Sequence, residues 1–413
     1  MSPPPNRFSL VALLVLLISL IPARQSDAGM AGGFTRTGAP HAVPTNPPVS
    51  ETSFVSIAGP SPFDRIGLHR LAGANRAGPP VLYLPGTNMN GELPLDDPRH
   101  WLPLYLAVNG CDVWSIDYRT HFIAPRTPQA ALAQLRGWTA AMFVSDIDTA
   151  ANFILRTTRQ PQLFVMGFSR GAAFAYLYAA SHPQKVRGLI ILDGFVLQHA
   201  AMAGLTERNS ETYATDIGGR SLTYDKRKAL LEAVIRDPDG PAPIPEYRTA
   251  RENLDHVVYE SRAFGGRGGL ADPLGGYSDA VTLARVLITY DRFWPTVQDR
   301  EDPMTAAMRQ RLARSKIPVL AFASTNIGPG WSANVQRAAS ATGSNPDVIV
   351  LSGWGHLDLL CGTHAESRIY VPALAWLRRH AAAKAGSVPA RKTSADSSAA
   401  AWRPAPTSRD ISR

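Results

Sequence analysis

The sequence is poor in cysteine: Cys111 and Cys361 are the only two among 413 residues. Two thiolates cannot complete an all-cysteine zinc site, and no HExxH motif offers a histidine-based one, so we predict no metal site. The sequence implies no organic cofactor either. The sequence does not reveal whether the two thiols come within bridging distance. An exported protein can form a disulfide, so we keep two alternatives: a disulfide between the two cysteines, or two unpaired thiols in the core.

Long apolar runs are also scarce. The one extended run covers residues 8–21, follows Arg7, and is succeeded by small residues up to Ala28. A bilayer span needs about 20 apolar residues, so this shorter run is typical of a secretory signal peptide at 1–28. We expect cleavage near Ala28, export to the periplasm or the medium, and no stable membrane span afterwards. An uncleaved signal anchor is the alternative.

Charged residues make up only 18% of the chain, and the formal net charge is +9. A basic balance can indicate binding to nucleic acid or to an anionic membrane surface. The arginines are scattered, however, and no basic stripe is interleaved with aromatic residues. We therefore expect a solvated basic surface and no nucleic-acid partner. The apolar share of 45% is enough for a sizeable core.

Composition divides the remaining chain into a core and three other parts. Residues 29–50 are rich in Gly, Pro, Thr and Ala and predict a linker, while residues 382–413 predict a disordered tail. Residues 51–195 and 315–381 alternate short apolar runs with helical stretches. Residues 196–314 interrupt this alternation with Gly/Pro clusters and apolar helical pieces. They predict a mostly helical cap, because a structureless loop of that length would be unusual.

The alternation predicts an α/β fold with a mostly parallel central sheet and helices on both faces. The cap enters before the penultimate core strand. Right-handed crossovers place the carboxyl ends of all parallel strands at one edge, where such sheets bind ligands. We expect a hairpin from 53–58 to 65–71 and core strands at 81–84, 112–117, 163–166, 186–192, 317–323 and 347–351.

One turn between an expected strand and an expected helix carries a nucleophile pattern. Residues 167–171 read GFSRG, directly after the apolar strand at 163–166. The GxSxG pattern is weak by itself, but the strand–turn–helix context is that of a nucleophile elbow. In such a turn the serine adopts a strained backbone that exposes its hydroxyl, and the flanking glycines avoid collisions with the neighbouring strand and helix. Ser169 is therefore the predicted nucleophile.

The chain resembles the α/β-hydrolase fold serine hydrolases, with esterases and lipases among them, over nearly all of residues 50–381. The run HLDLLCG from His356 to Gly362 resembles the segment around the catalytic histidine of acid, gastric-type lipases and their bacterial relatives. His356 also follows the last expected strand in a glycine-flanked loop. The resemblance implies that His356 is the general base that activates Ser169.

The same resemblance implies an oxyanion hole. In the family, the loop after the first core strand supplies a backbone N–H, and the residue after the nucleophile supplies a second. These positions are Thr87 and Arg170, with Pro85 in place of the histidine that is usual in that loop. Asn88 and Phe168 are expected to contact the substrate, with the Asn88 amide as an additional donor.

The acid of the triad has two candidates. The usual family position lies in residues 322–330, which contain no carboxylate, and Asn326 stands about where an aspartate is expected. In some members of the fold the acid lies one strand earlier, where Asp193 directly follows an expected strand. We favour Asp193 and keep Asn326 as the alternative. Asp358 is too near His356 in sequence to be its conventional partner and is expected to order the loop.

Other conspicuous residues receive structural roles. Asp117 ends an expected strand and is predicted to order a loop or the edge of a pocket. Asp146 and Asp148 lie on a predicted helix and are expected to be solvated. Phe293 and Trp294 are expected to belong to the core of the cap rather than to line a pocket.

These features together predict a serine hydrolase that cleaves a hydrophobic carboxylic ester through an acyl-enzyme. Its partner is a small-molecule ester, and no feature indicates an oligomeric state. The fold also hosts peptidases, thioesterases, lactonases and acyltransferases, so another acyl-transfer activity is an alternative. The missing carboxylate at the usual acid position motivates a further alternative, a non-catalytic binding protein on a hydrolase scaffold.

Overall fold

The computed structural model describes residues 33–73, 78–196, 214–216, 223–260, 278–299, 304–328 and 330–382. The expected signal peptide and all but the first residue of the expected tail lie outside these ranges. No helix within them combines the length and the apolar character that crossing a membrane requires. The strands are β1 (Thr35–Arg36), β2 (His41–Val43), β3 (Val49–Ile57), β4 (Arg65–Gly73), β5 (Pro80–Leu84), β6 (Asp112–Asp117), β7 (Leu163–Phe168), β8 (Val186–Leu192), β9 (Ala214–Asp216), β10 (Phe293–Pro295), β11 (Val319–Ser324) and β12 (Asp347–Leu351).

The helices are of three kinds. The α-helices are α1 (Leu102–Val108), α2 (Ala140–Thr158), α3 (Arg170–Ser181), α5 (Tyr224–Arg236), α6 (Ala250–Glu260), α7 (Ala280–Ile288), α8 (Ala306–Ser315), α9 (Trp331–Ser340), α10 (Asp358–Cys361) and α11 (Val371–Ala382). Short 3₁₀ turns are η1 (Pro98–His100), η2 (Arg119–Phe122), η3 (Gln129–Gly137), η4 (Pro183–Lys185) and η6 (Thr296–Asp299), and η7 (Glu366–Tyr370) is a π-helical turn.

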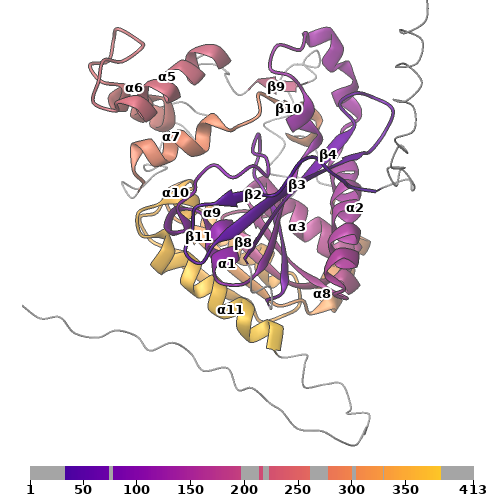
Figure 1. Cartoon of the computed structure of the whole chain (residues 1–413). Helices are drawn as coiled ribbons and strands as arrows, with labels where there is room; N and C mark the ends of the chain where they lie inside the picture. The colour runs from indigo at the N-terminus through magenta and orange to yellow at the C-terminus, as the bar shows by residue number, and fades with distance from the viewer. Residues whose placement is uncertain are drawn as a thin grey trace, which may run out of the picture.

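A ten-stranded sheet runs through the centre of the described molecule (Figure 1). Its order is β1-β3-β4-β6-β5-β7-β8-β11-β12, with β2 paired to β3. Neighbours from β6 to β12 in this order are parallel, whereas β3 and β4 form the predicted antiparallel hairpin. The mostly parallel α/β sheet is therefore confirmed. Because β6 and β7 lie on either side of β5, the winding direction reverses there, which is where such sheets place ligands.

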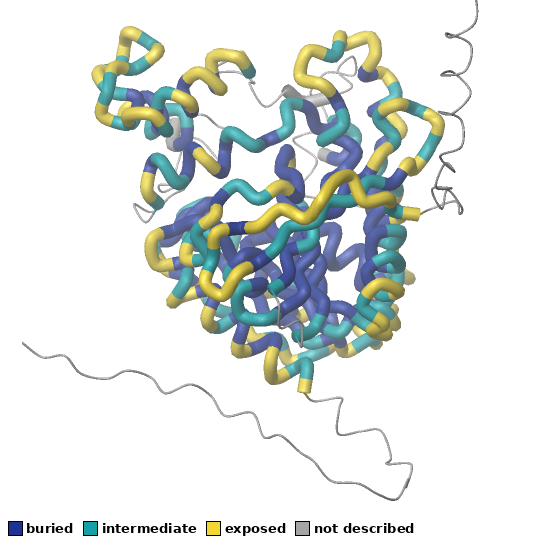
Figure 2. Tube along the Cα trace, in the orientation of Figure 1, coloured by how far each residue is buried: buried dark blue, intermediate teal, exposed yellow. Residues whose placement is uncertain are grey.

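The parallel strands β5, β6, β7, β8 and β11 bury both of their faces, whereas the edge strand β12 is partly exposed. In β5, Val81 and Tyr83 join the apolar cluster that contains α1 and α11, while Leu82 and Leu84 join the cluster that contains α2 and α3. Figure 2 shows the strands as a dark blue centre beneath partly exposed outer elements. Burying one such side chain contributes about 1.5–3 kcal/mol, so apolar residues on both faces explain the continuous apolar runs in the sequence.

Part of the segment expected to be a linker, residues 29–50, belongs to the sheet. β1 and β2 both pair antiparallel with β3, which itself begins at Val49. Each of the two added strands is only two or three residues long. Strands this short carry no readable alternation, and their Gly/Pro-rich surroundings resemble a linker in composition.

The cap lies between β8 and β11, before the penultimate strand. Its α5 packs against α6 and α7, and Figure 1 shows these helices as a group that stands apart from the sheet. The expected boundary at residue 314 differs from the structure, because α8 packs on α3 of the core and Arg311 donates a hydrogen bond to the Ala180 carbonyl. Phe293 and Trp294 of β10 join the core cluster of α2 and α3 rather than the centre of the cap.

A buried ion pair corrects the expectation that Asp146 is solvated. Asp146 is 6% exposed, and its carboxylate accepts hydrogen bonds of 2.6 and 2.8 Å from Arg119 of η2. Asp148, on the same helix, is partly buried and accepts from Lys185 at 2.6 Å. Burial raises the pKa of Asp146, and the Arg119 guanidinium opposes that rise. The partners come from distant segments, so the helix pattern alone did not reveal them.

Both cysteines are buried free thiols, which settles the open expectation in favour of unpaired core residues. Burial raises the pKa of Cys111 to about 11 and that of Cys361 to about 12. Both thiols are therefore protonated at neutral pH, and neither is a nucleophile there.

A histidine on β4 lies between two carboxylates. His69 Nδ1 is 2.9 Å from Glu51 Oε1 on β3, and Nε2 is 3.0 Å from Asp117 Oδ2 on β6. Burial lowers the pKa of His69, but the charges and hydrogen bonds of Asp117 and Glu51 outweigh it and raise the pKa to about 10. The imidazolium thus ties the antiparallel edge of the sheet to its parallel part.

We predict that His69→Gln destabilises the protein at pH 6 and has a much smaller effect at pH 10.5. The pKa of His69 is raised on folding above its ordinary 6.5, so its stabilisation is complete below that pH and is lost as pH rises through about 10. Urea unfolding of both proteins should show a difference in the free energy of unfolding on the order of 2 kcal/mol at pH 6. Equal differences at the two pH values would contradict this assignment.

Candidate active site

Ser169 lies in a strained turn between β7 and α3. Its backbone angles are φ 53° and ψ −117°, which residues other than glycine rarely adopt. A Cβ on Gly171 would lie 1.9 Å from the Leu84 carbonyl oxygen, and one on Gly167 would lie 2.4 Å from the Gly171 carbonyl oxygen. The backbones of the strand, the turn and the helix are therefore in direct contact, and only glycine fits at either end of the turn.

His356 and Asp193 meet at the same edge of the sheet. His356 follows β12 and Asp193 follows β8, yet His356 Nδ1 and Asp193 Oδ2 are 2.7 Å apart. Asp193 is fully buried, and its carboxylate also accepts hydrogen bonds from the backbone N–H and the hydroxyl of Ser324, at 2.7 and 2.6 Å. A carboxylate held in this way can fix the imidazole tautomer and stabilise its cation.

Asn326, the alternative position for the acid, bonds to the backbone of the histidine loop. Its Nδ2 donates to the Gly353 carbonyl at 2.7 Å, and its backbone N–H donates to the Trp354 carbonyl at 3.0 Å. It is Asp193, therefore, that contacts the imidazole. Because β8 and β11 are neighbours in the sheet, both candidates lie on adjacent strand ends, and chain order alone did not separate them.

The imidazole of His356 lies against Phe168, the residue that precedes Ser169. Its ring stacks on the Phe168 ring with centroids 4.5 Å apart, and the Trp331 ring meets it edge-on at 5.7 Å. Phe168, which was expected to contact the substrate, is 2% exposed, and its ring packs against the imidazole. Ser169 and His356 form no hydrogen bond to each other in the described structure, and such bonds often tighten only when substrate binds.

The loop after β5 passes beside Ser169. A Cβ on Gly86 would lie 3.2 Å from Ser169 Cβ, so Gly86 is in van der Waals contact with the turn. The expected donor, Thr87, is the next residue. Thr87 is exposed. Arg170 is the first residue of α3, and the first N–H groups of a helix point out of its amino-terminal end. Of the two predicted oxyanion donors, Arg170 directly follows Ser169, and Thr87 directly follows Gly86, which lies beside Ser169.

Asn88, expected to contact the substrate, joins the loop to the cap. Its Nδ2 donates to the Asp291 carbonyl at 2.9 Å, and its own carbonyl accepts from the Asp291 N–H at 2.7 Å. Its φ of 61° lies in the left-handed region, which asparagine tolerates better than most residues. The amide is therefore used in holding the loop rather than in an open pocket.

Two aspartates order the loops of the site, as the sequence suggested. Asp117 Oδ1 accepts from the Gly91 N–H at 2.7 Å, at the end of the loop after β5. Asp358 Oδ2 accepts from the Gly355 N–H at 2.8 Å, next to His356, and its Oδ1 accepts from Ser278 of the cap at 2.7 Å. The charge of His69 lowers the pKa of Asp117 against its burial, so this carboxylate stays ionised.

Sequence reasoning missed Ser324 and Trp331. Ser324 ends β11, beside the end of β8, and holds the Asp193 carboxylate. The position directly after an apolar strand was the available signal, but a lone serine there is common. Trp331 begins α9 and contacts both His356 and Phe195, and no local pattern distinguishes it from a core aromatic.

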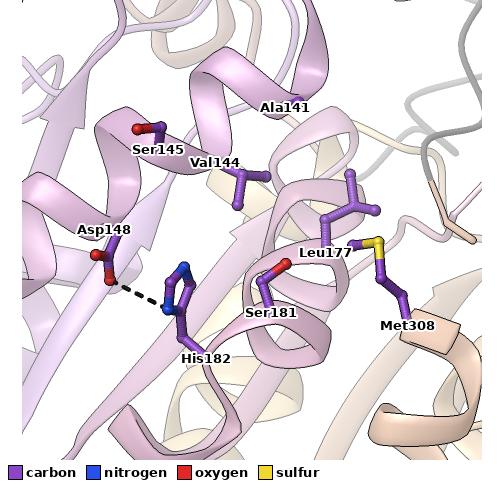
Figure 3. A pocket seen from close by; sticks show the side chains of 8 residues that line it. All are labelled: Ala141, Val144, Ser145, Asp148, Leu177, Ser181, His182 and Met308. Atoms are coloured by element: carbon purple, nitrogen blue, oxygen red, sulfur yellow. Dashed lines mark ion pairs between the residues drawn. The ribbon is translucent and has the colours of Figure 1, made fainter.

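A separate cavity of about 310 Å³ lies among α2, α3 and α8 (Figure 3). His182 there is 3.6 Å from Asp148, and both point toward the cavity. α3 runs from Arg170 beside the nucleophile to Ser181 at the cavity, a length of roughly 17 Å at 1.5 Å per residue. This cavity is therefore distinct from the Ser169 site. In the described ranges no group of three or more His, Cys, Asp or Glu residues could hold a metal ion.

Comparisons with known proteins agree with the fold. A family model described as alpha/beta hydrolase fold matches residues 79–227, and no curated protein sequence matches the chain. The structure of a candidate lipase from Sulfolobus solfataricus is similar to 84% of this chain and 99% of its own, with 24% identity and a TM-score of 0.69.

Two further structures are more distant. A carboxylesterase from Nitrososphaera gargenis covers 83% of this chain and 98% of its own, at 12% identity and a TM-score of 0.45. A soluble variant of monoglyceride lipase from Saccharomyces cerevisiae covers 86% and 97%, at 12% identity and a TM-score of 0.44. The sheet order, the strained turn at Ser169, the family model and the Sulfolobus structure together show that this chain has the α/β-hydrolase fold.

Proposed function

We propose that the protein is a serine hydrolase that cleaves a carboxylic ester through an acyl-enzyme on Ser169. One observation carries the proposal: the fully buried Asp193 carboxylate is 2.7 Å from His356, and the ring of His356 stacks on the residue that precedes Ser169. A buried carboxylate, an imidazole and a serine on a strained turn are the three parts that nucleophilic acyl transfer requires.

The mechanism proceeds in two steps. His356 takes the Ser169 proton as the hydroxyl attacks the ester carbonyl, and Asp193 stabilises the resulting imidazolium. The backbone N–H groups of Thr87 and Arg170 hold the oxyanion that forms. His356 then protonates the departing alcohol, and a water that it activates releases the acid from Ser169.

Aromatic side chains beside the base support a hydrophobic ester. The Phe195 and Trp331 rings are 4.8 Å apart, both are half-buried, and Trp331 lies edge-on to His356. Because His356 protonates the leaving group, side chains next to it face the alcohol part of the substrate. An apolar alcohol would remove water from these rings, at about 25 cal/mol per Å² buried.

We predict that Ser169→Ala lowers kcat/KM on p-nitrophenyl esters at least about 1,000-fold, because no other group replaces the nucleophile. A panel of short to long acyl chains measures this, and circular dichroism checks folding. Ser181→Ala, in the cavity of Figure 3, is the matched control and should retain wild-type activity. Turnover that persists in Ser169→Ala would refute the assignment of Ser169 as nucleophile.

A fluorophosphonate probe tests the alternative of a binding protein. A wild-type protein that neither turns over esters nor reacts with this probe would be a binding protein.

We predict that Asp193→Asn lowers kcat about 1,000- to 10,000-fold, whereas Asn326→Ala lowers it about 10-fold. An amide at 193 can donate to His356 Nδ1 and so favours the wrong tautomer, whereas Asn326 supports only the loop backbone. Steady-state kinetics of the two variants on one ester tests this. The reverse order of effects would make Asn326 the acid.

We also propose that residues 1–28 direct export and are then removed. The pattern of Arg7, the apolar run at 8–21 and the small residues up to Ala28 supports this. Amino-terminal sequencing of the protein from a bacterial periplasm or medium should begin near Gly29. A mature chain that retains residues 1–28 at the membrane would mean that the segment is an anchor.

A further inference from the structure

The loop at 86–91, which carries the proposed oxyanion donor Thr87, is held from the core and from the cap. On the core side, Asp117 of β6 accepts from the Gly91 N–H at 2.7 Å. On the cap side, the Asp291 N–H and carbonyl make two hydrogen bonds with Asn88, at 2.7 and 2.9 Å.

The side chain of Asp291 extends the cap-side contact. Asn90 Nδ2 donates to Asp291 Oδ1 at 3.1 Å and to the Thr289 carbonyl at 2.7 Å. Asn88 and Asn90 are both buried, at 5% and 6% exposed. Four hydrogen bonds therefore join residues 88–90 to residues 289–291, although some 200 residues of chain separate them.

Each of the two carboxylates is paired with a histidine. Asp117 pairs with His69, and Asp291 Oδ1 is 3.0 Å from His121 Nδ1 on η2. Glu92, just beyond the loop, is 3.9 Å from His121 Nε2. The pair of His121 and Asp291 thus bridges the core and the cap directly beside the loop.

We propose that Asp291 and His121 are positioning residues for the oxyanion hole. The Asp291 carboxylate, paired with His121, holds Asn90, and the Asp291 backbone holds Asn88, so this contact fixes the loop that carries the Thr87 N–H. The inference rests on the proposed function, in which that N–H binds the oxyanion. Donors in such a hole act by their fixed direction, so a loop released on its cap side loses transition-state stabilisation rather than substrate affinity.

The charges around the pair give the contact a pH dependence. Burial lowers the pKa of His121, but Asp291, Asp117 and Glu92 outweigh it and raise the pKa to about 9. Burial raises the pKa of Asp291, His121 and Asn90 oppose that rise, and the phenol of Tyr224 in α5 also faces this carboxylate. His121 is therefore charged below about pH 9. Above it, Asp291 is left as a buried carboxylate without its counter-ion, which is unfavourable.

The test measures kcat and KM of wild type, His121→Gln and Asp291→Asn on ethyl butyrate by pH-stat from pH 6 to 10.5. We expect kcat at pH 7 to fall about 10- to 100-fold in each variant, with KM changed less than threefold. Wild-type kcat should fall above about pH 9, and both variants should lack that decline. His182→Gln, which alters the distant pair with Asp148, is the control and should keep the wild-type profile.

Hydrogen exchange at pH 7 separates this inference from the proposed function. Amides in a peptide covering residues 84–92 should exchange at least about tenfold faster in both variants than in wild type or His182→Gln, whether or not an ester is cleaved. If wild type cleaves no ester but the exchange pattern is the expected one, the ester hydrolase proposal is wrong and the positioning contact is still supported. Unchanged exchange in both variants, or a loss in KM alone, would overturn the positioning role.

Discussion

The backbone at the amino-terminal end of α3 is in direct contact with the backbone at the end of β5, and the arrangement of the site depends on this contact. At Gly171 a side chain would overlap the Leu84 carbonyl oxygen, with a Cβ only 1.9 Å away. With glycine there, the chain can turn sharply enough to give Ser169 a positive φ and to bring the loop at Gly86 alongside it. A larger residue would push the helix away and so separate Ser169 from the loop and from the imidazole of His356.

The ends of two adjacent strands, β8 and β11, supply the groups that hold His356 and its loop. The end of β8 supplies the carboxylate of Asp193. At the end of β11, Ser324 bonds to that carboxylate, and Asn326 bonds to the backbone of the histidine loop. The carboxylate that bonds to His356 therefore lies one strand earlier than the region after β11. Ser324 and Asn326 occupy that region, and their hydrogen bonds hold the carboxylate and the histidine loop in place.

The cap is attached to the loops of the site through polar contacts as well as apolar packing. Ser278 bonds to Asp358 beside the histidine, Asp291 bonds to the loop after β5, and the Gln298 carbonyl accepts from the Arg170 side chain at 2.8 Å. Because directional hydrogen bonds tolerate little displacement, the position of the cap and the shape of these loops are coupled. The cap is therefore part of the frame that orients these loops.

The sequence by itself determined the features whose signals are local. Apolar runs between helical stretches predicted the parallel sheet, and the glycines around Ser169 and the strand before His356 predicted the turn and the histidine loop. Only the tertiary structure decided which aspartate meets His356, that Asn88 bonds to the cap, that Phe168 supports the imidazole, and that Asp146 is buried against Arg119. Periodicity and turn chemistry depend on neighbouring residues, whereas each of these contacts joins separate segments that only the folded sheet brings together.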